Sequence, residues 1–178
     1  MIFFLVQLHS VYTKILGTMN LKPMLERQML FDSALARSHQ ISDKAWIEPA
    51  ILALYVEVAE LANEIQCFKY WKKNKHINQL LVKEEYADGL HFLLSFLNEF
   101  QGIDQIEPVI VSSDLNQQFL AMFKAISQLT KSFEQVKIVA AFAIYLGIAK
   151  LLNMSDDEII DAYEYKNKIN FERIENNY

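Results

Sequence analysis

The sequence predicts an all-α protein, folded as a helical bundle of about six helices. Glycine and proline are scarce, with four and three copies among 178 residues, and these residues supply most turns and strand breaks. Hydrophobic residues make up 52% of the chain, and they recur at helical spacing, as at Ile138, Ala141, Phe142, Tyr145 and Leu146. A few long helices joined by short loops fit these observations better than a sheet fold with many turns.

The first half of the chain contains three expected helices, at about 22–38, from after residue 42 to about 73, and 77–100. Ser42 is a candidate N-cap of the second helix, because its hydroxyl can accept a hydrogen bond from a free backbone N–H. Pro49 gives this helix an irregular start. The longest non-helical stretch is expected at 102–113, which contains Pro108.

The second half contains three more expected helices, at about 114–131, from after residue 132 to about 152, and from after residue 155 to about 173. Ser132 with Gln135, and Ser155 with Glu158, each have the spacing of a capping box. In that motif the side chain of each residue accepts a hydrogen bond from the backbone N–H of the other, at the start of a helix. The two pairs therefore predict where the last two helices begin.

The N-terminal 18 residues are expected to form an extension to a single domain over 19–178. The apolar run 1–6 is far shorter than the ~20 residues of a membrane span, and no positive charge precedes it as in a secretory signal. An amphipathic helix is one reading of the extension. Translation starting at Met19 is another, and both remain open.

Charge and cysteine content exclude several kinds of partner. The formal net charge is −5, which argues against broad binding to a nucleic-acid backbone. A small phosphorylated substrate remains possible, because a bound cation reverses the local field. The single Cys67 excludes an internal disulfide and a cysteine zinc cluster. We expect a soluble, cytoplasmic protein without nucleic acid or membrane as partner.

Acidic side chains occur where apolar ones are expected. The segment 51–68 is apolar almost all round, and its only formal charges are Glu57, Glu60 and Glu64, which fall within a narrow arc of the helix. In the next helix Glu85 and Asp88 again stand three residues apart on one side. A lysine-rich loop should turn the chain back between these helices, so the acidic groups can face each other.

Converging carboxylates need compensation. Two like charges about 4 Å apart repel by roughly 4 kcal/mol at an effective dielectric near 20, so protons or cations must accompany them. A set of ligands that are all oxygen suits a hard ion, and Mg²⁺ is the usual one with phosphate substrates. The alternative is a solvated acidic stripe on an amphipathic helix. Two acidic pairs on adjacent apolar helices favour the metal site.

The pattern ExxE, twenty-four further residues and ExxD resembles the metal-binding signature of the all-α, MazG-like nucleotide pyrophosphatases. The segments EVAELANEIQCFKYWK, EEYADGLHFLLS and KNKINFERIENNY are more narrowly similar to the dimeric dUTPase family. This resemblance covers residues 19–178. It implies an all-helical homodimer that hydrolyses dUTP to dUMP and pyrophosphate and also accepts dUDP.

The resemblance also implies the cofactor and its ligands. It makes Mg²⁺ the cofactor, with two or more ions per site and Mn²⁺ as a substitute. The implied ligands are Glu57, Glu60, Glu85 and Asp88. Glu57 would also orient the water that attacks the β-phosphorus.

The resemblance implies a substrate site built from several parts of the chain. His91 and Phe92 match positions that line the nucleoside pocket, and Gln28 matches a glutamine that reads the base. The aromatic and basic segment after the first acidic motif supplies Trp71 to stack on uracil and Lys69 or Lys72 to meet a phosphate. The C-terminal segment supplies a triphosphate clamp or lid, formed by Lys166, Asn170, Arg173 and Tyr178.

Two other functions are compatible with parts of the pattern. An enzyme of the same superfamily acting on another nucleotide, such as dCTP, would share the metal site and differ only around the base. A helical interaction protein would use its long amphipathic faces to bind a partner and would turn over no nucleotide. The stretch 102–113 is where we expect any regulatory protein partner to bind.

Overall fold

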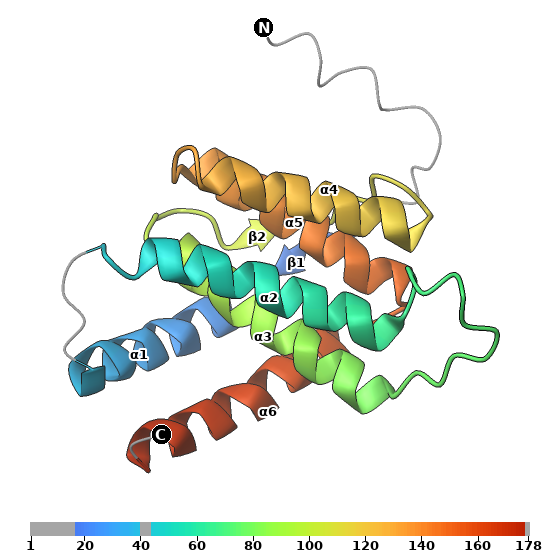
Figure 1. The fold of residues 1–178 in the computed structure, drawn as a ribbon. Helices are drawn as coiled ribbons and strands as arrows, with labels where there is room; N and C mark the ends of the chain where they lie inside the picture. The colour runs from blue at the N-terminus through green and yellow to red at the C-terminus, as the bar shows by residue number, and fades with distance from the viewer. Residues whose placement is uncertain (1–16, 40–43, 177–178) are drawn as a thin grey trace, which may run out of the picture.

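The computed structural model describes residues 17–39 and 44–176 and contains six long helices (Figure 1). The helices are α1 (Lys22–His39), α2 (Ile47–Ile65), α3 (Gln79–Asn98), α4 (Leu115–Leu129), α5 (Gln135–Leu151) and α6 (Asp156–Glu175). The prediction of an all-α bundle with about six helices is confirmed. Among the described residues, no single helix has both the length and the apolar composition of a membrane span; α5 and α6 meet those criteria only when joined across their 110° bend.

The helices form three layers, with α2 and α3 in the middle (Figure 1). Helices α4 and α5 lie on one side of this pair, and α1 and α6 lie on the other. The chain reverses between α2 and α3, so they pack as antiparallel neighbours, as expected. Any group that points from α2 or α3 toward α6 is therefore enclosed between layers.

A two-residue ribbon, which the sequence did not predict, joins the start of the domain to the long connection after α3. Strand β1 (Met19–Asn20) pairs antiparallel with β2 (Gln105–Ile106). Met19 and Leu21 are fully buried beside it. Residue 19 thus belongs to the packed core.

Two of the helix ends differ from the predictions. Helix α2 ends at Ile65 instead of about residue 73, because Gln66 adopts a left-handed conformation (φ 58°). The backbone N–H of Gln66 donates a hydrogen bond to the Ala62 carbonyl and so caps the helix. The predicted capping box of Ser132 and Gln135 is wrong. Helix α5 follows Glu134 without any side-chain cap, and the Ser132 hydroxyl accepts a hydrogen bond from the Lys137 ammonium instead.

Other local predictions are confirmed. Ser155 and Glu158 form the capping box at the start of α6, with both reciprocal hydrogen bonds present. Helix α4 begins at Leu115, close to the predicted start at about 114, and the Asp114 side chain caps it. The Ser42 cap predicted for the second helix lies outside the described residues, and Trp46 occupies the N-cap position of α2 without a side-chain hydrogen bond.

A tyrosine pair fixes α5 against α3 behind the acidic motif. The rings of Tyr86 and Tyr145 stack with centroids 4.5 Å apart, and the Tyr145 hydroxyl donates to the Tyr86 carbonyl at 2.7 Å. Gly89 makes room for this contact, since a Cβ there would lie 2.4 Å from the Tyr145 oxygen. The glycine after Asp88 is therefore required by packing of α5 against the helix that carries the acids.

Candidate active site

Three carboxylates from the two helices of the middle layer meet beside α6. Glu57 of α2 and Glu85 and Asp88 of α3 each offer an oxygen within 4.8 Å of the others. All three side chains are partly buried. The antiparallel packing of α2 and α3 brings them together, because each helix presents its acids on the face that meets the other. The predicted convergence of these acids is therefore observed.

Burial and mutual repulsion make these carboxylates unusually basic. Desolvation, followed by the charges of Asp88 and Glu60, raises the pKa of Glu57 to about 7. Desolvation, followed by the charge of Glu60, raises the pKa of Glu85 to about 7 as well. Glu60 itself lies on an exposed part of α2 and acts on the cluster through its charge. The cluster holds protons near neutral pH unless a cation replaces them.

Lys166 of α6 provides a positive charge at the edge of the cluster. Its ammonium lies 2.7 Å from the Asp88 carboxylate and 2.8 Å from that of Glu84. The Lys166 side chain is only 6% exposed, so this is a largely desolvated ion pair. Desolvation still outweighs the lysine and raises the pKa of Asp88. Lys166 thus forms a salt bridge with one of the three clustered acids, and it acts on the other two, Glu57 and Glu85, only through its charge at longer range.

The donor set fits a hard divalent cation. All three converging ligand atoms are carboxylate oxygens, which Mg²⁺ and related ions prefer. Their pKa values are raised by desolvation and by mutual repulsion, and a bound cation offsets both effects. Glu60, the fourth predicted ligand, is exposed on α2 and is not among the three converging residues, although its charge raises the pKa of Glu57 and Glu85. The cluster can therefore hold a metal ion and, through that ion, phosphate oxygens.

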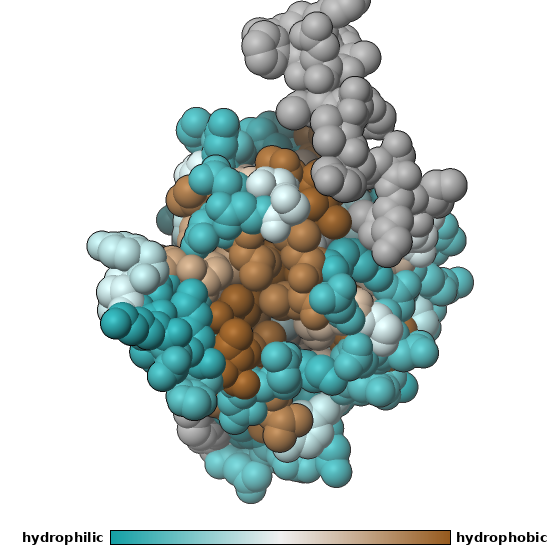
Figure 2. All heavy atoms as spheres, turned by 90° about the vertical axis from the view of Figure 1, so that its right-hand side faces the viewer, coloured by the Kyte–Doolittle hydropathy of each residue, from teal (hydrophilic) through white to brown (hydrophobic). Residues whose placement is uncertain are grey.

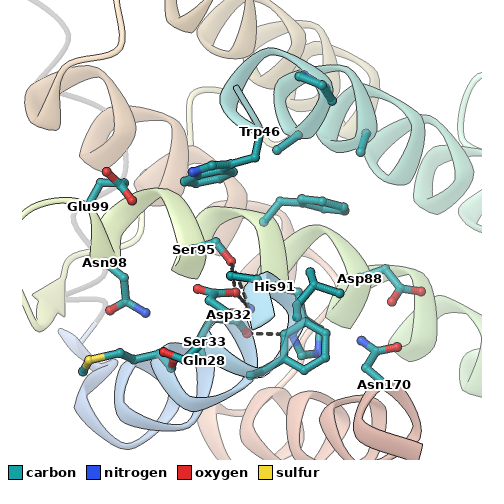
Figure 3. A pocket seen from close by; sticks show the side chains of 18 of the residues that line it. Gln28, Asp32, Ser33, Trp46, Asp88, His91, Ser95, Asn98, Glu99 and Asn170 are labelled. Atoms are coloured by element: carbon teal, nitrogen blue, oxygen red, sulfur yellow. Dashed lines mark hydrogen bonds between the residues drawn. The ribbon is translucent and has the colours of Figure 1, made fainter. Parts of the chain in front are cut away.

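A cavity of about 710 Å³ opens from the cluster and runs along α3. Figure 3 shows Asp88 and Asn170 at one end of it and Asn98 and Glu99 at the other. Residues from four helices line this cavity: Gln28, Phe31, Asp32, Trp46, Ala53, Glu57, Asp88, His91, Phe92, Ser95, Asn170 and Arg173 are among them. A cavity of this size accommodates a nucleotide-sized ligand.

A chain of hydrogen bonds crosses the floor of the cavity (Figure 3). The Gln28 amide nitrogen donates to Asp32 at 2.8 Å and to Ser95 at 3.0 Å. Its oxygen lies 2.7 Å from Nδ1 of His91 and 3.0 Å from the Tyr163 hydroxyl. The side-chain amide of Gln28 is therefore within hydrogen-bond distance of four neighbouring side chains. The structure brings Gln28 to the cavity wall but directs its hydrogen bonds into the protein.

The aromatic and C-terminal residues are brought together only in part. Asn170 and Arg173 line the cavity, joined by a hydrogen bond of 3.3 Å between their side chains. Trp71 is 61% exposed on the loop after α2 and packs edge-on against Tyr70. The Lys69 ammonium on that loop lies 3.2 Å from the Asn63 carbonyl. Neither of these two loop residues lines the cavity, and Tyr178 lies outside the described residues.

Sequence reasoning missed part of the cavity wall. Trp46, stacked on Phe96 with centroids 5.9 Å apart, covers the side opposite Asp32 (Figure 3). Asp32 and Ser95 stand four residues after Gln28 and His91, respectively, and so share their helix faces. That spacing was available as a signal for both. Trp46 precedes its helix, and no periodic pattern points to it.

The fold and the site define an all-α protein that presents a carboxylate cluster at the end of a ligand-sized cavity, as hydrolases of phosphorylated substrates do. The model of the dUTPase family matches residues 20–178. The chain therefore belongs to this dUTPase family and is an enzyme that hydrolyses dUTP. No curated protein matches the sequence significantly.

Proposed function

We propose that the enzyme cleaves dUTP, and also dUDP, with Mg²⁺ as its cofactor, releasing dUMP together with pyrophosphate or phosphate. Glu57, Glu60, Glu85 and Asp88 would hold two or more ions, and Mn²⁺ would substitute. The observation that carries this proposal is the convergence of three carboxylate oxygens within 4.8 Å at the end of the cavity. When bound, the metal neutralises phosphate charge and acidifies a coordinated water.

Glu57 is placed to orient the attacking water. It belongs to the acidic cluster and also lines the cavity, so it stands between the phosphates and the rest of the substrate. In the metal-free cluster its pKa is raised to about 7. With the cation bound in place of that proton, the Glu57 carboxylate would orient the water and accept its proton.

The cavity supports a nucleotide with its phosphates at the Asp88 end and its nucleoside along α3. His91 and Phe92 flank the nucleoside position, and Asn170 and Arg173 face it from α6. Arginine and lysine donate to phosphate oxygens, which supports a contact of Arg173 with the triphosphate. Lys166 would join this clamp only by exchanging its carboxylate partners, Asp88 and Glu84, for phosphate.

The remaining substrate contacts come from the dUTPase family likeness. Lys69 and Trp71 would reach the substrate by movement of their loop, Tyr178 would close over it, and Gln28 would read the base. Closure of the loop and the C-terminal segment would exclude water from the reacting phosphates.

A metal-dependent nucleotide panel tests the proposal. The purified enzyme is incubated with dUTP, dUDP, dCTP and dTTP, each with Mg²⁺ and with a chelator, and the released pyrophosphate and phosphate are measured separately. We expect dUMP and pyrophosphate from dUTP in the presence of Mg²⁺ only. Undiminished turnover in the chelator would refute the metal assignment. Preference for dCTP would refute the substrate assignment and leave the metal site standing.

An exposed apolar area supports a homodimer. Figure 2 shows apolar side chains gathered around a hollow on the face where α2 ends and α3 begins. Phe68, Leu80 and Leu81 are among the exposed apolar residues of these elements. Contiguous exposed apolar surface marks interaction sites more often than free surface. Sedimentation at several protein concentrations tests the dimer.

We further place the enzyme in the cytoplasm, where the thiol of Cys67 stays reduced.

A further inference from the structure

The buried ammonium of Lys166 has two carboxylate partners whose surroundings differ. It lies 2.7 Å from Oδ2 of Asp88 and 2.8 Å from Oε1 of Glu84. Asp88 is 19% exposed and belongs to the acidic cluster, whereas Glu84 is 41% exposed and is not among the three converging residues. A metal ion in the cluster can therefore claim one partner of Lys166, and the other partner is left to the lysine.

Asp88 lies between these two environments on α3. At about 100° per residue, Glu84 stands about 40° to one side of Asp88 and Glu85 about 60° to the other side. Glu85 belongs to the cluster, so Asp88 is shared between the clustered acids and Lys166. Glu84 and Asp88 are also one helical turn apart, which lets both carboxylates flank the same ammonium.

A divalent cation in the cluster would compete with Lys166 for Asp88. Both carry positive charge, and like charges repel strongly in a partly desolvated site. The ammonium does not have the option of turning into water, because the Lys166 side chain is only 6% exposed. A buried charge without a partner is costly. Glu84 already contacts the ammonium and would remain as its acceptor.

We propose that Glu84 is a positioning residue that keeps Lys166, and with it α6, in place when a divalent cation takes over Asp88. This role rests on the proposed function, because it assumes that the cluster holds a metal. In the metal-free protein Lys166 is shared by both acids, as observed. In the metal-loaded, nucleotide-free enzyme it pairs with Glu84 alone. A cation is thereby kept beside the acidic cluster, ready for an arriving phosphate.

A second ion pair between the same two helices offers a comparison. The Lys83 ammonium of α3 lies 2.8 Å from Glu158 of α6, and both side chains are at least one-third exposed. Neither residue belongs to the acidic cluster. Glutamine can replace glutamate at the third position of a capping box, so Glu158→Gln removes this pair and retains the cap of α6. It is therefore a matched control for Glu84→Gln.

Metal affinity tests the role of Glu84 without requiring turnover. Free Mn²⁺ is measured by electron paramagnetic resonance with wild type, Glu84→Gln, Lys166→Met, the double variant and Glu158→Gln. A hydrogen bond to a charged group typically changes an equilibrium constant by about 10- to 150-fold. Because Glu84 is partly exposed, we expect the lower end, a loss of Mn²⁺ affinity of about tenfold in Glu84→Gln. Glu158→Gln should bind Mn²⁺ as wild type does.

The Lys166→Met background distinguishes positioning from simple charge attraction. If Glu84 acts through Lys166, adding Glu84→Gln to Lys166→Met should weaken Mn²⁺ binding several-fold less than it does in the wild-type background. If Glu84 attracts the metal only by its own charge, the loss should be the same in both backgrounds. Equal losses would overturn the inference, as would wild-type affinity in Glu84→Gln.

A second measurement does not depend on a variant that folds. The crystal structure of the wild-type, nucleotide-free protein with Mg²⁺ should show the Lys166 ammonium within hydrogen-bond distance of Glu84 and no longer paired with Asp88. An ammonium that stays on Asp88 and leaves Glu84, or one that leaves both acids, would contradict the inference directly.

These results separate the inference from the proposed function. Absence of Mn²⁺ binding to the wild-type protein would overturn the metal assignment and this role of Glu84 together. Binding of Mn²⁺ with an affinity that does not respond to Glu84 would overturn the role of Glu84 alone and leave the metal site standing.

Discussion

The ammonium nitrogen of Lys166 lies 2.7 Å from Oδ2 of Asp88 and ties helix α6 to the acidic cluster. The same nitrogen contacts Glu84, so one lysine offsets two carboxylates that face it from α3. Because a buried cation costs free energy unless it is paired, α6 is held where Lys166 finds these acids. The position of the helix that also carries Asn170 and Arg173 is thus coupled to the charge of the cluster.

Lys166→Gln should destabilise the metal-free protein. Removing one partner of a largely desolvated pair costs about 3 kcal/mol, which corresponds to a fall in Tm of about 6–12 °C for a chain of this size. Thermal unfolding in a chelator measures the effect. Lys168→Gln, at an exposed position on the same helix, serves as the control. A loss no greater than that of the control would show that the ion pair contributes little.

Glu57→Gln should remove most turnover while making the metal-free protein more stable. The amide cannot accept the proton of the water, and it no longer repels Glu85 and Asp88. With allowance for solvent screening, relief of that repulsion amounts to about 1 kcal/mol, a rise in Tm of about 2–4 °C. Initial rates with dUTP and unfolding in a chelator test both effects. Glu64→Gln, one turn beyond the pair on α2, is the matched control. Equal turnover in Glu57→Gln and wild type would contradict the assignment.

The stability of the metal-free protein should depend on the protonation of the cluster. The folded-state pKa values of Glu57 and Glu85 are about 7, above the value of 4.5 for an unperturbed glutamate. Between these pH values the folded state binds more protons than the unfolded state, so the free energy of unfolding falls as pH rises from 4.5 through 7.

Tm measured against pH in a chelator should show this loss, and the slope should be shallower in Glu57→Gln than in wild type. Protons and metal compete for the same oxygens, so Mg²⁺ affinity should weaken as pH falls below about 7. Identical slopes in the two proteins would mean that Glu57 titrates as an ordinary surface acid.

Arg173→Ala should raise KM and lower kcat for dUTP. Arg173 lines the cavity beside Asn170, where its guanidinium can meet phosphate oxygens. Loss of a charge-assisted contact of about 1.5–3 kcal/mol predicts a fall in kcat/KM of about 10- to 150-fold. Steady-state kinetics with Arg37→Ala, at the exposed end of α1, as control tests this. Kinetics equal to that control would mean that α6 does not contact the substrate.

The sequence was most informative where helical periodicity and charge agreed. The positions of Glu57, Glu85 and Asp88 within apolar helices predicted their convergence, because a buried face leaves few directions for a carboxylate. The start of α6 followed from the reciprocal bonds that Ser155 and Glu158 can make. Local spacing decides such features, so one sequence suffices to predict them.

Features that depend on distant packing were not predictable. The ribbon of Met19–Asn20 with Gln105–Ile106 joins segments far apart in the sequence. Trp46 reaches the cavity because its stacking on Phe96 directs it there. The pairing of Lys166 with Asp88 brings a residue predicted for phosphate binding onto a predicted metal ligand, and only the docking of α6 on α3 determines this contact.

The connection between the two acid-bearing helices, residues 66–78, runs over the surface and supplies none of the clustered oxygens. The Gln66 side chain holds the two ends of this connection together. Its amide nitrogen donates to the His76 carbonyl at 2.9 Å, and its oxygen accepts from the Lys72 ammonium at 2.9 Å. Chain length in such a segment changes the closure entropy only slowly. The length of this connection can therefore vary without moving the acidic cluster, whereas the substrate contacts proposed for Lys69 and Trp71 would vary with it.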